Sequence, residues 1–294
     1  MSTEPLTEGL HFDVPMERYI ADPCVNPSIS KGIIHSLISK SPAHAKYDHP
    51  RLNPDRPPDD SSRADLGSAI HSAILGGADI VYGEEEFKDW RKKAAQQFRT
   101  EARENGQIPL LYAQRPEVEM AAKEADVLLK SLPSWDGNMK TEGTMIWKDD
   151  ENWKRGRFDI WMRDMDTLID VKTTASADPS NWIRNTLFGT GYDIQAEHYT
   201  DGIVATEGLK KRPKFLFLLV EIKPPFCCSL VGLDPAFSDL ARRKVKKGTE
   251  IWQECMERNY WPGYSQMPHW AELPGWHEAD VMSRMEYAEE AMKK

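Results

Sequence analysis

Apolar residues in the first half of the chain recur at intervals of three and four, the spacing of one face of a helix. These stripes predict helices over residues 28–40, 64–75, 84–104 and 116–131. Ser41-Pro42 and Gly76-Gly77 are typical stop signals for the first two of these helices. The segment 1–27 has prolines at positions 5, 15, 23 and 27, and we expect it to be irregular.

The pattern changes near residue 140, where short apolar runs are separated by acidic turns. These runs predict three successive strands, over residues 141–150, 153–164 and 166–174. Beyond them the pattern predicts helices over 178–187 and 193–206, strands over 214–222 and 226–233, and a long helix over 235–258. The order of elements is typical of an α+β or mixed α/β domain with a helical N-terminal elaboration.

The domain organisation follows from the same pattern, because no stretch has the composition of a clean linker. We therefore expect one domain over residues 28–265. The irregular segment 1–27 would precede it, and a tail rich in aromatic residues and proline would follow over 266–294.

The sequence LIDVKTTAS, residues 168–176, places charges inside a run that otherwise predicts a buried strand. Alternate side chains of a strand share a face. Ile169 and Val171 therefore point one way, and Asp170 and Lys172 point the other way together. If this strand pairs with the preceding one as a hairpin, Asp159 and Asp170 converge.

Two converging carboxylates form an oxygen-rich site suited to Mg²⁺ or Mn²⁺. A lysine beside such a site would orient or activate a water molecule, or stabilise charge that develops on a phosphate. The alternative is a surface salt bridge between Asp170 and Lys172, since an Asp-x-Lys sequence often occurs by chance.

Composition narrows the class of protein only a little. The formal net charge of −9 argues weakly against a nucleic-acid binder, although an acidic protein can carry a local basic groove. The four cysteines have no metal-site spacing, and we expect reduced thiols. With no signal peptide and no apolar run of membrane-spanning length, we expect a soluble cytoplasmic protein.

Four motifs in order along the chain resemble the PD-(D/E)XK nuclease superfamily. GRFD at 156–159 and IDVKTT at 169–174 resemble its core motif, with Phe158 where a proline is usual. DLGSAIH at 65–71 and YDIQAEHY at 192–199 resemble the Gly-x-x-x-His and Gln-x-x-x-Tyr motifs of its RecB-like branch. Together with LISKSPAHAKY at 37–47 and WPGY at 261–264, they resemble the RecE-type exonuclease VIII group over about residues 26–265.

The resemblance implies a central mixed sheet flanked by helices, with one or two Mg²⁺ or Mn²⁺ ions bound at it. The implied metal ligands are Asp159, Asp170, the backbone carbonyl of Val171, His71 and Glu142. Gly67, one turn before His71, would let that helix approach the sheet closely. Lys172 would position or activate the attacking water. Two of these assignments are open. His71 could instead be a histidine at the edge of a buried apolar stripe, and the assignment of Glu142 is based only on its position in the sequence.

The resemblance also implies contacts with DNA. Gln195 and Tyr199 would touch the DNA backbone or support the catalytic lysine, the alternative being an ordinary helix with a buried tyrosine. Thr173 and Thr174 would contact a phosphate, or serve as strand formers. Ser30 and Lys31 would help to shape the DNA entrance. The basic clusters at 210–214 and 242–247 would line a phosphate-tracking groove, or form solvated surfaces.

The implied function is a metal-dependent exonuclease that degrades linear double-stranded DNA from its 5′ ends and leaves 3′ overhangs for recombination. Relatives of this type are ring-like oligomers, trimers or tetramers, of phage or prophage origin in a bacterial cytoplasm, paired with a single-strand annealing protein of the RecT type. The alternatives are an endonuclease or single-strand-specific nuclease of the same fold, and a catalytically silent DNA-binding accessory protein. Dependence on a free DNA end separates the exonuclease from the other nucleases of the same fold.

Overall fold

A computed structural model describes residues 4–56, 65–76, 80–133, 135 and 139–293. These residues form two compact units, Met1–Pro262 and Gly263–Lys294. The α-helices of the first unit are α1 (Met16–Ile20), α2 (Lys31–Ser39), α3 (Pro42–Asp48), α4 (Asp65–Leu75), α5 (Lys93–Glu104), α6 (Arg115–Lys130), α7 (Pro179–Trp182), α8 (Phe188–Thr190), α9 (Tyr192–Glu207) and α10 (Pro235–Arg258). A π-helical turn, Ile183–Leu187, joins α7 to α8.

The strands of the first unit form two main sheets and one short parallel pair among the described residues. The strands are β1 (Gly9–His11), β2 (Ile80–Tyr82), β3 (Ile108–Leu110), β4 (Lys140–Thr141), β5 (Thr144–Asp149), β6 (Asn152–Arg157), β7 (Ile160–Met162), β8 (Thr167–Thr174), β9 (Lys214–Glu221) and β10 (Cys228–Gly232). The larger sheet has the order β10-β9-β8-β7-β4, and the smaller has the order β1-β5-β6. The larger sheet is mixed, since β8 pairs parallel with β9 and antiparallel with β7.

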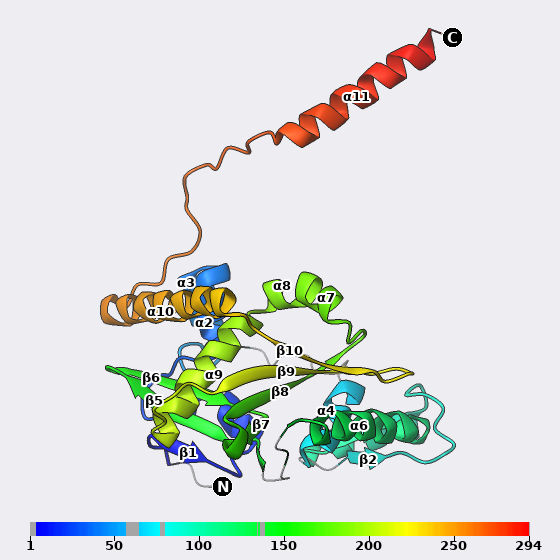
Figure 1. Cartoon of the computed structure of the whole chain (residues 1–294), viewed down its shortest axis with the longest axis vertical. Helices are drawn as coiled ribbons and strands as arrows, with labels where there is room; N and C mark the ends of the chain where they lie inside the picture. The colour runs from blue at the N-terminus through cyan, green and yellow to red at the C-terminus, as the bar shows by residue number, and fades with distance from the viewer. Residues whose placement is uncertain (1–3, 57–64, 77–79, 134, 136–138, 294) are drawn as a thin grey trace. The chain divides into compact units, whose positions relative to one another are not determined.

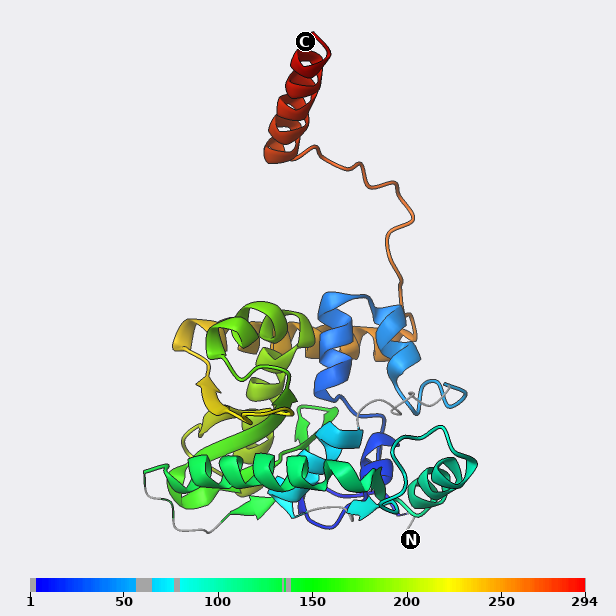
Figure 2. The same ribbon diagram turned by 90° about the vertical axis from the view of Figure 1, so that its right-hand side faces the viewer.

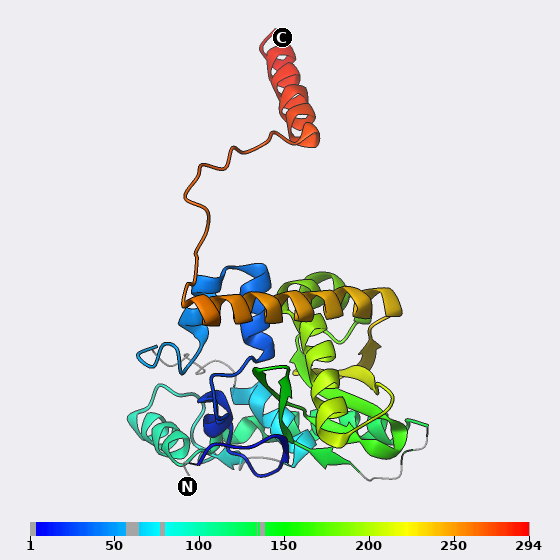
Figure 3. The same cartoon turned by 90° about the vertical axis from the view of Figure 1, so that its left-hand side faces the viewer.

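Helices cover both faces of the larger sheet (Figure 1). On one face α4 and α6 pack together, and Figure 2 shows α6 running across the front of this layer. The buried core beneath them includes Ile169 and Val171 of β8. On the other face lies α9, and α10 crosses it and α2, as Figure 3 shows. The expected mixed α/β class with flanking helices is confirmed, and so is the alternation along β8.

Two predicted strands are in fact each divided between the two sheets, which corrects the expected three-strand meander. The run 141–150 belongs to β4 and β5, and the run 153–164 belongs to β6 and β7. The chain bends at Gly143 and Phe158, where the Phe158 amide donates to the Gly143 carbonyl at 3.1 Å. A Cβ atom on Gly143 would lie 2.3 Å from the Phe158 ring, so only glycine fits this bend.

The N-terminal segment also differs from expectation, because residues 1–27 contain β1 and α1. β1 pairs with β5, with Gly9 opposite Ile146, and so takes the edge of the smaller sheet. A strand of three residues gives too short an alternation to be recognised in a sequence. Within 84–104 the helix begins only at Lys93, and the predicted helix over 178–187 is broken by the π-helical turn.

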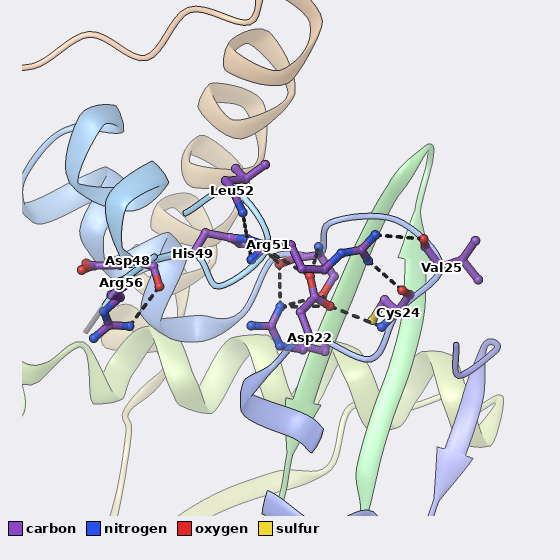
Figure 4. A network of polar contacts seen from close by, with 10 residues as sticks. Asp22, Cys24, Val25, Asp48, His49, Arg51, Leu52 and Arg56 are labelled. Atoms are coloured by element: carbon purple, nitrogen blue, oxygen red, sulfur yellow. Dashed lines mark hydrogen bonds and ion pairs between the residues drawn. The ribbon is translucent and has the colours of Figure 1, made fainter. Parts of the chain in front are cut away.

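A buried polar network centred on Asp22 fixes the loop that leads into α2 (Figure 4). The Asp22 carboxylate accepts hydrogen bonds from the Ser28 amide at 2.8 Å and from the Ser28 hydroxyl at 2.6 Å. It also lies 3.3 Å from His49 Nε2 and 3.4 Å from the Arg155 guanidinium. Burial opposes ionisation, but His49, Arg155 and Ser28 together lower the pKa of Asp22 to about 2.

His198 of α9 is fully buried beside the smaller sheet. Its Nε2 lies 3.0 Å from the Arg155 carbonyl, and its ring packs on Trp147 with the ring centroids 4.8 Å apart. Burial, together with the positive charge of Lys154, lowers the pKa of His198 to about 3. The folded protein therefore holds this imidazole neutral over a pH range in which the unfolded chain binds a proton.

We expect His198 to make the free energy of unfolding depend on pH. Between pH 6.5 and about 3 the unfolded state binds one more proton here, so stability falls as the pH falls, by about 1.4 kcal/mol per pH unit. Asp170, a buried carboxyl whose pKa is raised to about 6, contributes a slope of the opposite sign over part of this range. The His198 contribution is therefore the difference between wild-type protein and His198→Gln in denaturant unfolding at pH 8, 6.5 and 5. This variant keeps a donor but does not titrate, so it should change the slope below pH 6.5. An unchanged slope in this variant would contradict the assignment.

The second unit, Gly263–Lys294, contains the helix α11 (Gly275–Met292). The expected tail over 266–294 is therefore helical in large part. Its large apolar side chains are exposed, including Trp270 and Trp276. No helix among the described residues of either unit combines the length and apolar character that crossing a membrane requires.

Candidate active site

The two acids of the predicted core motif meet where β7 and β8 pair. Ile160 lies opposite Ile169 in this antiparallel register, so Asp159 and Asp170 fall at neighbouring positions just beyond the paired stretch. Because β7 begins only at Ile160, the edge of β8 is open there, and the Val171 amide donates to Asp159 Oδ2 at 2.7 Å. The N–H and C=O groups of one strand residue point to the same edge, so the Val171 carbonyl also faces this side.

Helix α4, which lies well before β7 and β8 in the sequence, brings His71 to the same place. His71 Nε2 lies 3.1 Å from Asp159 Oδ2, and these residues are 88 positions apart. The close approach depends on Gly67, since a Cβ atom there would lie 2.9 Å from Thr173 Oγ1. His71 and Glu142 also line one pocket of about 600 Å³, together with Gly67, Thr173 and Thr174.

Lys172 forms an ion pair with Asp170 on the opposite face of β8 from Val171. The carboxylate is almost completely buried, at 2% exposure. Gln195 of α9 donates to Asp170 Oδ1, while Oδ2 contacts the Lys172 ammonium without a well-formed hydrogen bond. The oxygen of the Gln195 amide is also buried without a partner.

Their surroundings give the carboxyl groups of Asp159 and Asp170 different pKa values. Burial raises the pKa of Asp170 to about 6, and Asp159 adds to the rise against the opposing Lys172. Burial also opposes the ionisation of Asp159, but His71, Lys172 and the Val171 amide hold the pKa of Asp159 below its usual value. Burial opposes the charged forms of His71 and Lys172, but the carboxylates hold the pKa of both groups above their usual values. Two crowded carboxyl groups of this kind are typical of functional sites.

Glu142 lies beside Asp159 at the bend between β4 and β5. Its amide donates to the Asp159 carbonyl at 2.9 Å, and its φ of +55° is unusual for a residue with a side chain. The Glu142 carboxylate lies 3.2 Å from the Arg157 guanidinium. The structure therefore brings Glu142 to the rim of the site, with its charge partly engaged by Arg157.

The donor set fits a hard divalent cation. Asp159, Asp170 and the Val171 carbonyl supply the oxygen ligands that Mg²⁺ and Mn²⁺ prefer. His71 adds an imidazole nitrogen, a ligand more typical of transition metals. A cation would also relieve the crowding of the two carboxyl groups. As these side chains stand, no three potential ligands among the described residues form a ready-made cluster. The reason is that His71 bonds to Asp159 while Lys172 and Gln195 engage Asp170.

The residues expected at the DNA lie in different surroundings. Gln195 and Tyr199 are buried, at 4% and 7% exposure, and Gln195 binds Asp170 instead of reaching outward. Tyr199 packs in the core between the smaller sheet and α9, as the alternative of a buried tyrosine expected. Thr173 faces Gly67, whereas the Thr174 hydroxyl donates to the Ser176 carbonyl at 3.1 Å and closes the turn after β8.

The basic clusters at 210–214 and 242–247 are largely neutralised within the protein. Arg212 pairs with Glu197 and Asp201, and Lys244 pairs with Asp193. The other ion pairs of the clusters join Arg242 to Glu197 and Asp239, Arg243 to Asp239, Lys247 to Glu250 and Lys211 to Asp166. These contacts favour solvated, internally paired surfaces over a free groove for phosphates.

Sequence reasoning missed Tyr192, whose ring contacts Lys172. The Lys172 ammonium lies 4.4 Å from the ring centroid, and the Lys31 ammonium lies 5.0 Å from it. Tyr192 is three residues before Gln195, so it shares a helix face with that residue. This spacing was a signal in the sequence, although it does not reveal what the ring touches.

Comparison with known proteins places this geometry in a family. The sequence profile of a family described as a PDDEXK-like domain of unknown function (DUF3799) matches residues 35–270. No curated protein matches the chain. Four-fifths of the sequence therefore carries the pattern of one PDDEXK-like family.

Solved structures similar to this chain include three exonucleases, and one of them shares its fold. A "Putative exonuclease" from Eubacterium rectale superposes with a TM-score of 0.56 over 90% of this chain and 96% of that one, at 12% identity. A phage-related exonuclease from Haemophilus somnus 129PT gives 0.34 over 79% and 96%, at 12% identity. An alkaline exonuclease from Laribacter hongkongensis gives 0.32 over 67% and 93%, at 15% identity. The family match, together with the fold shared with the first of these structures, confirms the predicted PD-(D/E)XK-like fold.

Proposed function

The chain belongs to the PDDEXK-like family DUF3799, and from this premise we propose that it is a metal-dependent DNA exonuclease of the RecE type. The observation that carries the proposal is the meeting of Asp159, Asp170 and Lys172 with His71, from two adjacent strands and a helix. A protein that only bound DNA would have no chemical need for two crowded carboxyl groups beside a buried lysine.

The proposed reaction is hydrolysis of a phosphodiester bond. Water adds to phosphorus, one phosphorus–oxygen ester bond breaks, and the leaving oxygen takes a proton. Mg²⁺, or Mn²⁺ in its place, would be held by Asp159, Asp170, the Val171 carbonyl and His71, with Glu142 at the rim, and would supply Lewis-acid stabilisation of the phosphate.

The protein's own residues would do the remaining work. Lys172, held by Asp170 and Tyr192, places a positive charge beside the carboxylates, where it orients the attacking water or stabilises charge on the phosphate. Gln195 holds the Asp170 carboxylate in place through its amide. Gly67 lets α4 come close enough for His71 to reach Asp159.

The substrate and partners belong to the same proposal. We infer linear double-stranded DNA as the substrate, resected from 5′ ends to leave 3′ overhangs. A ring-like trimer or tetramer would enclose the duplex and would help an acidic chain to hold DNA. The RecE-type resemblance favours a RecT-type annealing protein as partner, and a phage or prophage protein acting in the bacterial cytoplasm.

Dependence on a free end tests this function. Purified protein with Mg²⁺ should degrade linear duplex DNA and leave a covalently closed circle intact, releasing a 5′ label early as mononucleotide and a 3′ label late. Asp170→Ala should be inactive in the same assay. Cutting of the circle would replace the exonuclease reading with an endonuclease. An intact linear duplex with both Mg²⁺ and Mn²⁺ would favour a silent accessory protein.

A further inference from the structure

One aromatic ring at the active site contacts two ammonium groups. Tyr192, the first residue of α9, has the Lys172 ammonium at 4.4 Å and the Lys31 ammonium at 5.0 Å from its centroid. A positive charge over the face of a tyrosine is attracted by the negative face of the ring. One Tyr192 ring therefore contacts two positive charges.

The Tyr192 ring packs on two buried aromatic side chains. It stacks on Trp182 at 5.7 Å with an interplanar angle of 8°, and it contacts Phe217 of β9 at 5.8 Å. Both of these aromatic residues are almost completely buried. Packing on two fixed side chains leaves the Tyr192 ring little freedom, so it forms a rigid platform for the lysines.

The two lysines differ in how their charge is balanced. Lys172 pairs with Asp170, whereas no described carboxylate lies within 4.0 Å of the Lys31 ammonium. Burial and the charge of Lys172 lower the pKa of Lys31 to about 8, against the opposing pull of Asp170 and Asp193. A half-buried ammonium without a carboxylate is costly in the free protein, and an anionic ligand removes that cost.

Lys31 also borders a second pocket, of about 520 Å³, lined by Ser30, Lys40, Arg155 and Tyr199 among others. Among the described residues that line it, the one acidic side chain is Asp48, which accepts a hydrogen bond from Ser36 at 2.8 Å. Lys31 therefore stands between the carboxylates of the active site and a space with an excess of positive charge. An anion that extends from the active-site carboxylates to the second pocket would contact the Lys31 ammonium.

We propose that Lys31 binds a backbone phosphate of the DNA strand being cut, and that Tyr192 is a positioning residue that holds Lys31 and Lys172 at fixed places on one ring. This deepens the proposed function and rests on it for the identity of the anion. Lys172 faces the carboxylates, and Lys31 takes a non-bridging oxygen of the phosphate. No covalent step involves either Lys31 or Tyr192.

The salt dependence of DNA binding tests the role of Lys31. Binding of linear duplex DNA to the full chain is measured with Ca²⁺ in place of Mg²⁺, with the DNA verified to be intact. Lys31→Met should weaken binding about tenfold, and it should reduce the slope of log K against log[salt] by about one, because one phosphate contact is lost. Lys31→Arg should restore most of the slope. The control Lys130→Met removes an exposed lysine that pairs with Asp126, and it should leave the slope unchanged.

The steady-state kinetics of two substitutions test the platform. Tyr192→Phe keeps the ring and should retain kcat within about twofold. Tyr192→Leu removes the ring and should lower kcat about tenfold, with KM raised as well because both lysines lose their support. Thermal unfolding shows whether Tyr192→Leu has a folding defect. If it has one, the inference is tested by the salt slope of DNA binding in Lys31→Met and by the kinetics of Tyr192→Phe. A Tyr192→Phe variant as impaired as Tyr192→Leu would overturn the platform.

Failure of this inference is separable from failure of the proposed function. If wild-type protein degrades DNA while Lys31→Met has the wild-type salt slope, the phosphate role of Lys31 is wrong and the nuclease stands. If wild-type protein degrades nothing while the slope falls by about one, the phosphate site stands and the proposed hydrolysis is wrong.

Discussion

Replacing Lys172 with alanine should abolish DNA hydrolysis while the protein still binds divalent metal. The ammonium lies between Asp170 and the Tyr192 ring, where it carries the positive charge nearest to the carboxylates. Removing a group that acts on the attacking water or on developing charge costs about 10³-fold in rate. Release of labelled nucleotide from linear duplex DNA measures this loss.

Asp170→Ala should differ from Lys172→Ala in one respect, since it should lose metal binding as well as hydrolysis. Calorimetric titration with Mn²⁺ separates the two variants: Lys172→Ala should retain the binding heat, and Asp170→Ala should not. Lys148→Ala is the matched control. That lysine lies on β5 of the smaller sheet, against Trp153, and its loss should leave both activity and metal binding unchanged.

Either of two results would remove the site assignment. Hydrolysis at the wild-type rate in Lys172→Ala or in Asp170→Ala would show that the reaction occurs elsewhere. Metal binding at the wild-type level in Asp170→Ala would show that this carboxylate is not a ligand. Loss of metal binding in Lys172→Ala alone would assign the lysine to holding the acids together and not to the reaction.

Asp22→Ala should lower the free energy of unfolding by about 3–5 kcal/mol. The carboxylate is buried against the Arg155 guanidinium and binds both polar groups of Ser28. Its removal leaves a buried positive charge without its partner, which is among the most destabilising of single changes. Urea unfolding at pH 7 measures the loss.

Two further substitutions divide this effect into its causes. Asp22 has a φ of +65°, and an alanine there adds backbone strain. Asp13 has a similar φ of +59°, but the residue is exposed, so Asp13→Ala should show the strain alone, at about 1 kcal/mol. Asp22→Asn keeps the shape and one acceptor and should fall between them. Equal losses in Asp22→Ala and Asp13→Ala would refute a contribution from the network.

The sequence predicted the parts of the site that depend on short-range pattern. Alternation along 168–174 placed Asp170 and Lys172 on one face of the strand. In the structure, Ile169 and Val171 lie on the opposite face and are buried in the hydrophobic core. The i to i+4 spacing in α4 predicted that Gly67 would let His71 approach the sheet, and Gly67 does meet Thr173 closely. These features follow from the periods of strands and helices.

What the sequence did not predict depends on tertiary contacts. The bends at Gly143 and Phe158 lie within apolar runs that look continuous, and only the packing of one residue on the other reveals them. The contact of Gln195 with Asp170 and the contact of Tyr192 with two lysines join segments far apart in the chain. The basic clusters looked free because their carboxylate partners come largely from other elements.

The parallel pairing of β8 with β9 has a consequence for the order of folding. Thr167 pairs with Lys214, and α7, α8 and α9 lie between these two strands in the sequence. The contact of His71 with Asp159 spans 88 residues. Such non-local contacts form late, because they close large loops at a cost in chain entropy. During refolding, helical signal should therefore return before His71 reaches Asp159, and a chain with only its local hairpins and helices formed does not yet bring the proposed metal ligands together.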